Sequence, residues 1–127
     1  MMEGVVTAAL EATLPLHIQD ANGQKITVDA VIDTGFTGEL ALPAAVVDML
    51  SFPLRGVRSA MLGDGRRAMV EVYEAQVLWQ GELREVQLLA MEGCLVGMSL
   101  LHGNDVHLRV VEGGFVRVAK TPGFPKP

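Results

Sequence analysis

The stretch VIDTGFTGELALP, residues 31–43, decides how the chain is interpreted, because an apolar strand ends there in a polar tripeptide. Asp33-Thr34-Gly35 alone is typical of a turn, since Asp and Thr bond nearby backbone and Gly accepts a positive φ. Its position is unusual, because the carboxylate follows the apolar residues 30–32, where the strand enters a core. An ionised group is rarely placed at such a point without a partner. The stretch therefore predicts a buried strand that ends in a functional carboxylate.

Composition places the chain among folded, mildly acidic proteins of one domain. It has 127 residues, of which 50% are hydrophobic and 20% are charged, with a formal net charge of −5. A chain of this length fits one domain. Because a nucleic-acid partner requires a basic face, this balance argues against one. Fourteen glycines beside 5% aromatic residues favour a turn-rich β protein with an aliphatic core.

Cysteine usage and the first residues bear on location. Cys94 is the only cysteine, so no intrachain disulfide can form, which suits a reducing compartment. The start of the chain lacks the positive region of a signal peptide and carries Glu3 and Glu11 instead. No apolar run approaches the roughly 18 residues of a membrane-spanning helix. We therefore expect a cytoplasmic protein with no membrane partner.

Short apolar runs between turn signals predict many strands and few helices. Residues 5–19 form one long strand or two consecutive ones, with Pro15 marking an edge or a break. The other expected strands cover 26–33, 57–62, 67–79, 83–91, 106–111 and 115–119, with tight turns at 20–25 and 63–65. Short helices are expected within 43–50 and 97–103.

The sum of these elements predicts an all-β protein, a small closed or partly closed β-barrel with one or two short helices. We expect residues 1–119 to form this single domain. Residues 120–127, KTPGFPKP, are expected to be a mobile proline-rich tail.

Three motifs follow one another in a specific order. They are Val31-Ile32-Asp33-Thr34-Gly35, then the glycine-flanked hairpin tip Leu62-Gly63-Asp64-Gly65, then Leu95-Val96-Gly97 before a short helix. In this order they resemble the retropepsin-like aspartic proteases, the single-domain relatives of pepsin, which have a glycine-rich flap hairpin between the other two motifs. The resemblance covers roughly residues 5–111 and is strongest to the small prokaryotic branch with an Asp-Thr-Gly-Phe motif. It implies a barrel of the acid-protease type.

The resemblance also implies an aspartic peptidase acting on peptide or protein substrates. Hydrolysis by carboxylates needs two of them around one water, one removing a proton and the other protonating the carbonyl oxygen. Asp33 would be the catalytic carboxylate, Thr34 would brace the pair through its hydroxyl, and Gly35 would let the backbone approach closely. The implied substrate-binding residues are Phe36, Leu62, Gly63, Asp64, Gly65, Val96 and Gly97.

The number of motifs predicts a homodimer. Of the six aspartates, Asp33 alone begins Asp-Thr-Gly, so one chain carries half of a two-carboxylate site. A symmetric dimer would bring the two Asp33 side chains together on its two-fold axis. Viral members of the family carry a paired Asp and Arg near the dimer interface, where this chain has Thr37 and Met98. Because both charges are absent together, no unpaired buried charge remains.

A second interpretation stays open, in which a non-catalytic barrel binds peptide segments or partner proteins and keeps Asp33 for structure. The intact Asp-Thr-Gly favours the enzyme, since a binding protein has no evident need for all three residues.

Cys94 is expected to be a small buried hydrophobic residue rather than a nucleophile. Arg66 and Arg67 are expected in a solvated turn, although both could lie beside a substrate channel.

No metal or cofactor is expected. The three histidines show no metal-ligand spacing with Cys94 or with the carboxylates, so they are interpreted as surface or structural residues. They are His17, His102 and His107.

Overall fold

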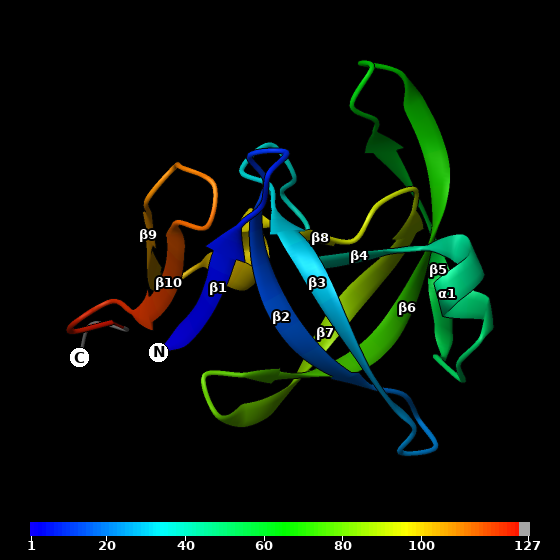
Figure 1. The fold of residues 1–127 in the computed structure, drawn as a ribbon. Helices are drawn as coiled ribbons and strands as arrows, with labels where there is room; N and C mark the ends of the chain where they lie inside the picture. The colour runs from blue at the N-terminus through cyan, green and yellow to red at the C-terminus, as the bar shows by residue number, and fades with distance from the viewer. Residues whose placement is uncertain (125–127) are drawn as a thin grey trace.

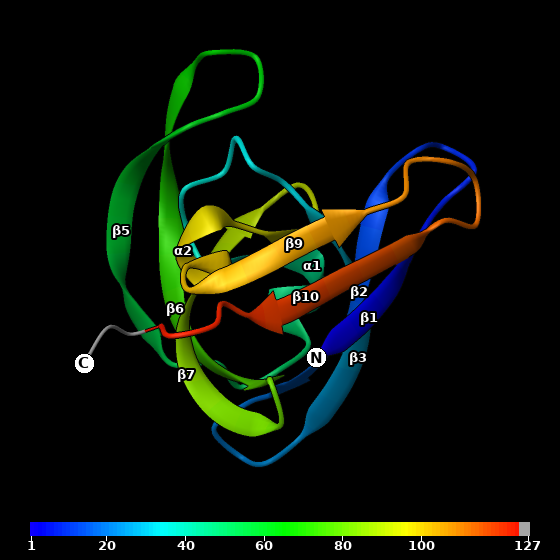
Figure 2. The same cartoon turned by 90° about the vertical axis from the view of Figure 1, so that its left-hand side faces the viewer.

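The computed structural model describes residues 1–124, so residues 125–127 of the predicted tail lie outside the described range. The fold is mostly β, with 56% of residues in strands and 7% in helices, around a closed barrel of six strands. Figure 1 shows the barrel, and Figure 2 shows it turned by 90°. The predicted all-β barrel, closed or partly closed and with one or two short helices, is confirmed: the barrel is closed and the helices are two.

Between Met1 and Phe124 the chain forms ten strands and two helices. The strands are β1 (Met2–Val6), β2 (Ala12–Gln19), β3 (Lys25–Ile32), β4 (Leu40–Pro43), β5 (Leu54–Met61), β6 (Arg67–Trp79), β7 (Glu82–Met91), β8 (Leu95–Val96), β9 (Asn104–Leu108) and β10 (Phe115–Lys120). The helices are α1 (Ala44–Asp48) and α2 (Met98–Leu101). Neither of these two helices, the only ones among residues 1–124, is long and apolar enough to cross a membrane.

The barrel closes where β2 meets β6. Its strands follow the order β6-β7-β4-β8-β3-β2, and Ile18 of β2 pairs with Val77 of β6 to complete the ring. Outside the ring, β5 pairs with β6, while β1, β10 and β9 extend the sheet from β2. Closure removes the open edges that a flat sheet of the same six strands would expose.

Alternating side chains along β2 fill the barrel. Leu14, Leu16 and Ile18 are buried, whereas Pro15 and His17 between them are exposed. Each buried Leu or Ile side chain contributes roughly 1.5–3 kcal/mol through removal of apolar surface from water. This two-residue period turns one face of β2 toward the core. The same period is the pattern by which the sequence predicts a strand here.

The predicted strand over 5–19 divides at a turn rather than at Pro15. In this turn the Leu10 N–H donates to the Thr7 carbonyl at 2.9 Å, and Leu10 has φ +59°. At Pro15 the strand continues, paired with Asp29 of β3. Within residues 1–124 neither β1 nor β6 pairs with Pro15 on the other side. Proline is tolerated there because no second ladder requires its missing N–H.

The short strand β8 lies between β3 and β4, which are consecutive in the chain. It runs parallel to β3, pairing Leu95 with Val31, and antiparallel to β4, pairing Val96 with Leu40. The connection from β3 to β4, residues 33–39, therefore passes over the end of β8. This crossing places the Asp-Thr-Gly motif at one end of the barrel.

The hairpin of β5 and β6 extends beyond the barrel at that same end (Figures 1 and 2). We call its outer part, residues 57–71, the flap. At its tip the Leu62 N–H donates to the Arg66 carbonyl at 2.7 Å, and Gly65 takes φ +84°, which favours glycine. Because β5 is the last strand of the sheet, its outer edge carries no neighbouring strand among the described residues.

The first residues of the predicted tail contact the domain. Strand β10 runs to Lys120, and the Thr121 N–H then donates to the Gly103 carbonyl at 2.9 Å. The Phe124 ring packs edge-on against the His102 ring, with 5.1 Å between their centroids. Residues 121–124 thus lie against the segment that follows α2.

Candidate active site

Asp33 stands at the end of β3, with its backbone fixed by β8. Its N–H donates to the Val96 carbonyl at 2.9 Å, and its side chain is half-buried. One carboxylate oxygen, Oδ1, accepts the Gly35 N–H at 2.9 Å. A Cβ at Gly35 would lie 3.3 Å from that oxygen, closer than most side-chain contacts, so glycine keeps this turn compact. The carboxylate is thereby held in one orientation with its second oxygen available.

The loop 33–39 is tied to the segment that leads from β8 into α2. Backbone N–H groups of the second segment donate to carbonyl oxygens of the loop, and one hydroxyl does the same. The pairs are Gly97 to Glu39 at 2.9 Å, Met98 to Phe36 at 2.8 Å, Ser99 to Gly38 at 3.2 Å, and the Ser99 hydroxyl to Thr37. The loop is therefore ordered by residues about sixty positions later in the chain.

Gly97 is required for this contact. A Cβ on residue 97 would overlap the Gly38 carbonyl oxygen and stand 2.7 Å from Cδ2 of Phe36. Val96, one residue earlier, is completely buried. Both residues were expected to bind substrate, but they lie behind the loop and support it from the barrel side.

A cavity of about 790 Å³ separates this loop from the flap. Its floor contains Asp33, Gly35, Phe36 and Thr37, and its wall on the β7 side contains Leu89 and Met91. Residues 58–63 and Arg67 of the flap line the opposite side. The cavity thus unites five of the residues predicted for the site: Asp33, Gly35, Phe36, Leu62 and Gly63.

The remaining predicted residues lie elsewhere around the flap and loop. Asp64 and Gly65 are at the flap tip, where Asp64 borders a second hollow of about 480 Å³ on the side of β7. Thr34 is exposed beside Asp33.

The flap tip is stabilised by its own charges. Asp64 Oδ1 accepts the Arg66 N–H at 3.0 Å, and Oδ2 accepts the guanidinium Nε–H of Arg66 at 2.6 Å. The Arg66 backbone N–H and then its guanidinium lower the pKa of Asp64 below the ordinary value. Because both side chains are half-exposed or more, this pair shapes the turn and adds little stability.

Sequence reasoning missed one arginine of the cavity and left the place of another open. Arg58 was not considered, whereas Arg67 was expected in a solvated turn or beside a substrate channel; both line the cavity, and Arg67 is exposed. Ser59, Met61 and Leu89 were also missed as lining residues. The motif order marks the flap tip, but only the curvature of the hairpin decides which of its residues face Asp33.

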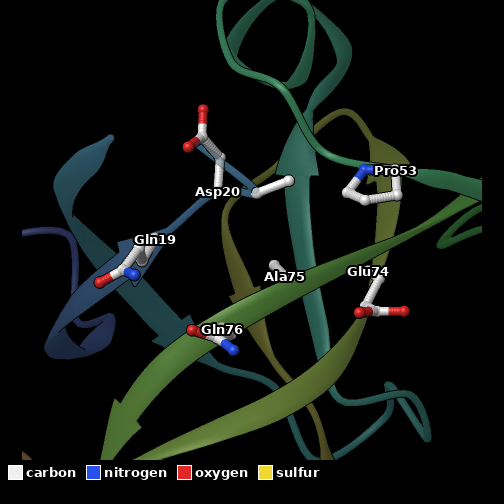
Figure 3. Close-up of a pocket in the computed structure, with 7 residues that line it drawn as sticks. Gln19, Asp20, Pro53, Glu74, Ala75 and Gln76 are labelled. Carbon is white, nitrogen blue, oxygen red and sulfur yellow. The ribbon is translucent and has the colours of Figure 1, made fainter. Parts of the chain in front are cut away.

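A smaller cavity lies at the other end of the barrel. It measures about 130 Å³ and lies beside the β2–β3 turn (Figure 3). Its one buried acid, Asp20, is fully engaged, since its two carboxylate oxygens accept the N–H groups of Asn22, Gln24 and Ser51, each at 2.9 Å. The Ser51 bond above all lowers the pKa of Asp20. This carboxylate is structural.

The thiol of Cys94 is a second candidate reactive group. Cys94 is half-buried, and burial together with the charge of Asp29 raises the pKa of its thiol to about 11, so it is a poor nucleophile at neutral pH. In residues 1–124 no group of three or more His, Cys, Asp or Glu side chains could hold a metal ion.

Comparison of the chain with protein-family models, with curated proteins and with solved structures finds no match. Function is therefore inferred from the geometry of the site and from the chemistry of its residues.

Proposed function

We propose that the protein is an aspartic endopeptidase that works as a homodimer in the cytoplasm, with Asp33 of each chain forming the catalytic pair. One observation supports this most strongly. The Asp33 carboxylate is fixed on the floor of a cavity of about 790 Å³, directly opposite a glycine-tipped hairpin. A cavity of this size suits a segment of several residues.

The shape of the cavity suits an extended peptide. Four consecutive residues of β5, 58–61, line it together with two residues of the turn, 62–63, as expected when a strand presents its edge rather than one face. An extended segment can pair with such an edge through main-chain hydrogen bonds, while alternate side chains enter pockets. A peptide bound in this way would pass over Asp33.

The chemistry requires a second carboxylate. Two carboxylates about 3 Å apart cannot both ionise readily, so they share one proton. The ionised one takes a proton from a water, the water oxygen bonds to the peptide carbonyl carbon, and the protonated one gives its proton to the carbonyl oxygen. Collapse of this intermediate breaks the C–N bond, and the amine leaves with a proton returned from the carboxyl pair.

A single chain provides half of this machinery, so a two-fold dimer is part of the proposal. Thr34 is exposed beside Asp33, and in the proposed dimer its hydroxyl would contact the loop of the second chain. Two loops held rigidly by β8 and α2 would approach with little loss of conformational entropy, because their backbones are already ordered.

The test compares a substitution in β3 with one at the residue that follows this strand. Asp33→Asn keeps the size of the side chain but removes the base, whereas Asp29→Asn changes an exposed carboxylate four residues earlier. Each purified protein is incubated with a peptide library, and the products are identified by mass spectrometry. We expect cleavage by the wild type and by Asp29→Asn, and none by Asp33→Asn. Equal cleavage by all three proteins would refute the proposal, and binding without cleavage by the wild type would favour a peptide-binding barrel.

A further inference from the structure

The arginines of this chain divide into two groups according to their partners. Five of the seven have one: four lie within 4.0 Å of a carboxylate, and Arg109 stacks over the Phe115 ring at 4.7 Å. Arg58 and Arg67 are the other two. Within residues 1–124 neither has a carboxylate within that distance. In a protein with a net charge of −5, where carboxylates outnumber the basic groups, this is unexpected.

Both of these arginines line the cavity that holds Asp33. Their protein contacts are long and involve neutral groups. Nη1 of Arg58 is 3.5 Å from Oε1 of Gln87, and Nη1 of Arg67 is 3.4 Å from Oγ of Ser59. A guanidinium has five N–H donors in a planar fork, so most of this capacity remains open to a ligand.

We infer that the cavity selects peptide segments with acidic side chains, which Arg58 and Arg67 bind on the flap side of Asp33. This inference rests on the proposed binding of a peptide in the cavity. A guanidinium binds a carboxylate through two parallel N–H to oxygen bonds, which are short and stronger than bonds between neutral groups. The two arginines would thus act as specificity-determining residues.

The spacing of the two arginines favours carboxylates over a phosphate group. Arg67 pairs with Met61 in the hairpin register, and Arg58 is three residues from Met61 along β5. Three residues of a strand span about 10 Å, so the two guanidinium groups originate at separate points. Phosphate sites bring several donors to one group, whereas separate arginines suit separate side chains of an extended peptide. Nucleic acid is disfavoured by the acidic balance of the chain.

The experiment uses pairs of peptides. The two peptides of a pair are identical except at one position, where one has Glu and the other has Gln, and this position differs from pair to pair along the peptide. Cleavage by the wild type is compared with cleavage by Arg58→Gln, Arg67→Gln and the double variant. Arg55→Gln is the matched control, because Arg55 lies on the same strand but is paired with Glu74 at 2.8 Å and is absent from the cavity lining. Binding of the same pairs to Asp33→Asn protein is measured in parallel.

We expect the wild type to prefer Glu over Gln about tenfold in kcat/KM at one or more positions, as one charge-assisted bond in a partly shielded cavity would give. The preference should fall to about twofold or less in the double variant and persist in Arg55→Gln. It should also weaken as salt concentration rises, because the sites are open to solvent.

The outcomes separate this inference from the proposed function. Cleavage with no preference for Glu, or an equal loss of preference in Arg55→Gln, would overturn the inference and leave the peptidase standing. Selective binding of Glu peptides without cleavage would retain the inference and refute the peptidase. Neither binding nor cleavage of any peptide would overturn both.

Discussion

Gly97 lies so close to Gly38 that no side chain fits between them: a Cβ on residue 97 would overlap the Gly38 carbonyl oxygen. The close approach brings the start of α2 against the loop that carries Asp33. The N–H of Met98 then reaches the Phe36 carbonyl at 2.8 Å. Glycine at this position is therefore a condition for the order of the site.

Gly97→Ala should destabilise the protein, because the added methyl group meets backbone that cannot move aside without breaking these bonds. Gly97 has φ −101°, which alanine adopts freely, so the effect is steric. Overpacking of this kind costs about 1–3 kcal/mol of unfolding free energy. The measurement is the midpoint of urea denaturation. Gly63→Ala is the control, since a Cβ there meets nothing within 4 Å, and its effect should stay within about 0.5 kcal/mol.

Asp20→Asn should lower stability at neutral pH, because the amide nitrogen cannot accept the Ser51 N–H that a carboxylate oxygen now accepts. The pKa of Asp20 is lowered in the folded state, so the stabilisation is complete above its ordinary value of 3.8. It is lost as pH falls from that value through the lower, folded-state pKa. The difference between wild type and variant should therefore be constant near pH 7 and shrink below about pH 4. A difference independent of pH would contradict this account.

Cys94 should react slowly with iodoacetamide in the native protein. Its thiol pKa is raised from 9.0 to about 11, mainly by burial, so the thiolate fraction falls about a hundredfold. Alkylation at pH 8, followed by mass spectrometry, should be slower than in urea-unfolded protein by about that factor or more. Asp29→Asn should speed the native reaction, because the charge of Asp29 also raises this pKa. Native alkylation at the unfolded rate would show that the thiol is more accessible than its position indicates.

If the proposed site is formed from two chains, specific activity should fall on dilution below the dimer dissociation constant. Mixing provides a second measurement. When wild type exchanges freely with an equal amount of Asp33→Asn, random pairing leaves about half of the original wild-type dimers. Activity per wild-type chain should drop towards half.

Exchange must be verified independently, for example by the energy transfer between two fluorescent labels on different chains. Unchanged activity after verified exchange would mean that each chain works alone. In that case a site with one Asp33 from each chain would be wrong.

The sequence predicted those parts of the fold that depend on local pattern. The two-residue alternation of Leu14, Leu16 and Ile18 marks a strand with one buried face, and Asn22-Gly23 marks the hairpin that follows. Strand β6 occupies the predicted residues 67–79. The motif order also predicted that Asp33 and the flap tip belong to one site, and the cavity contains Asp33 with Leu62 and Gly63.

The rest depends on contacts that no local pattern encodes. The turn before β2 places Leu10 at a positive φ, which is unusual for a residue other than glycine and gives no signal in the sequence. Charged residues next to a turn are usually solvated, so the sequence left open whether Arg67 lies in a solvated turn or beside a substrate channel, and the structure places it in the cavity lining. Val96 was expected to bind substrate because of its motif, but it is buried in β8, where it pairs with Leu40 of the neighbouring strand β4.

Strand β8 lies about sixty residues after Asp33 in the sequence, and this order matters during synthesis of the chain. Translation supplies about 5–20 residues per second, so several seconds separate the appearance of Asp33 from that of the segment that orders its loop. Until Ser99 has been added, the growing chain has the carboxylate but lacks the backbone donors that hold it in place. A nascent chain would therefore be inert towards its neighbours on the ribosome, and any activity would begin only once the barrel had closed.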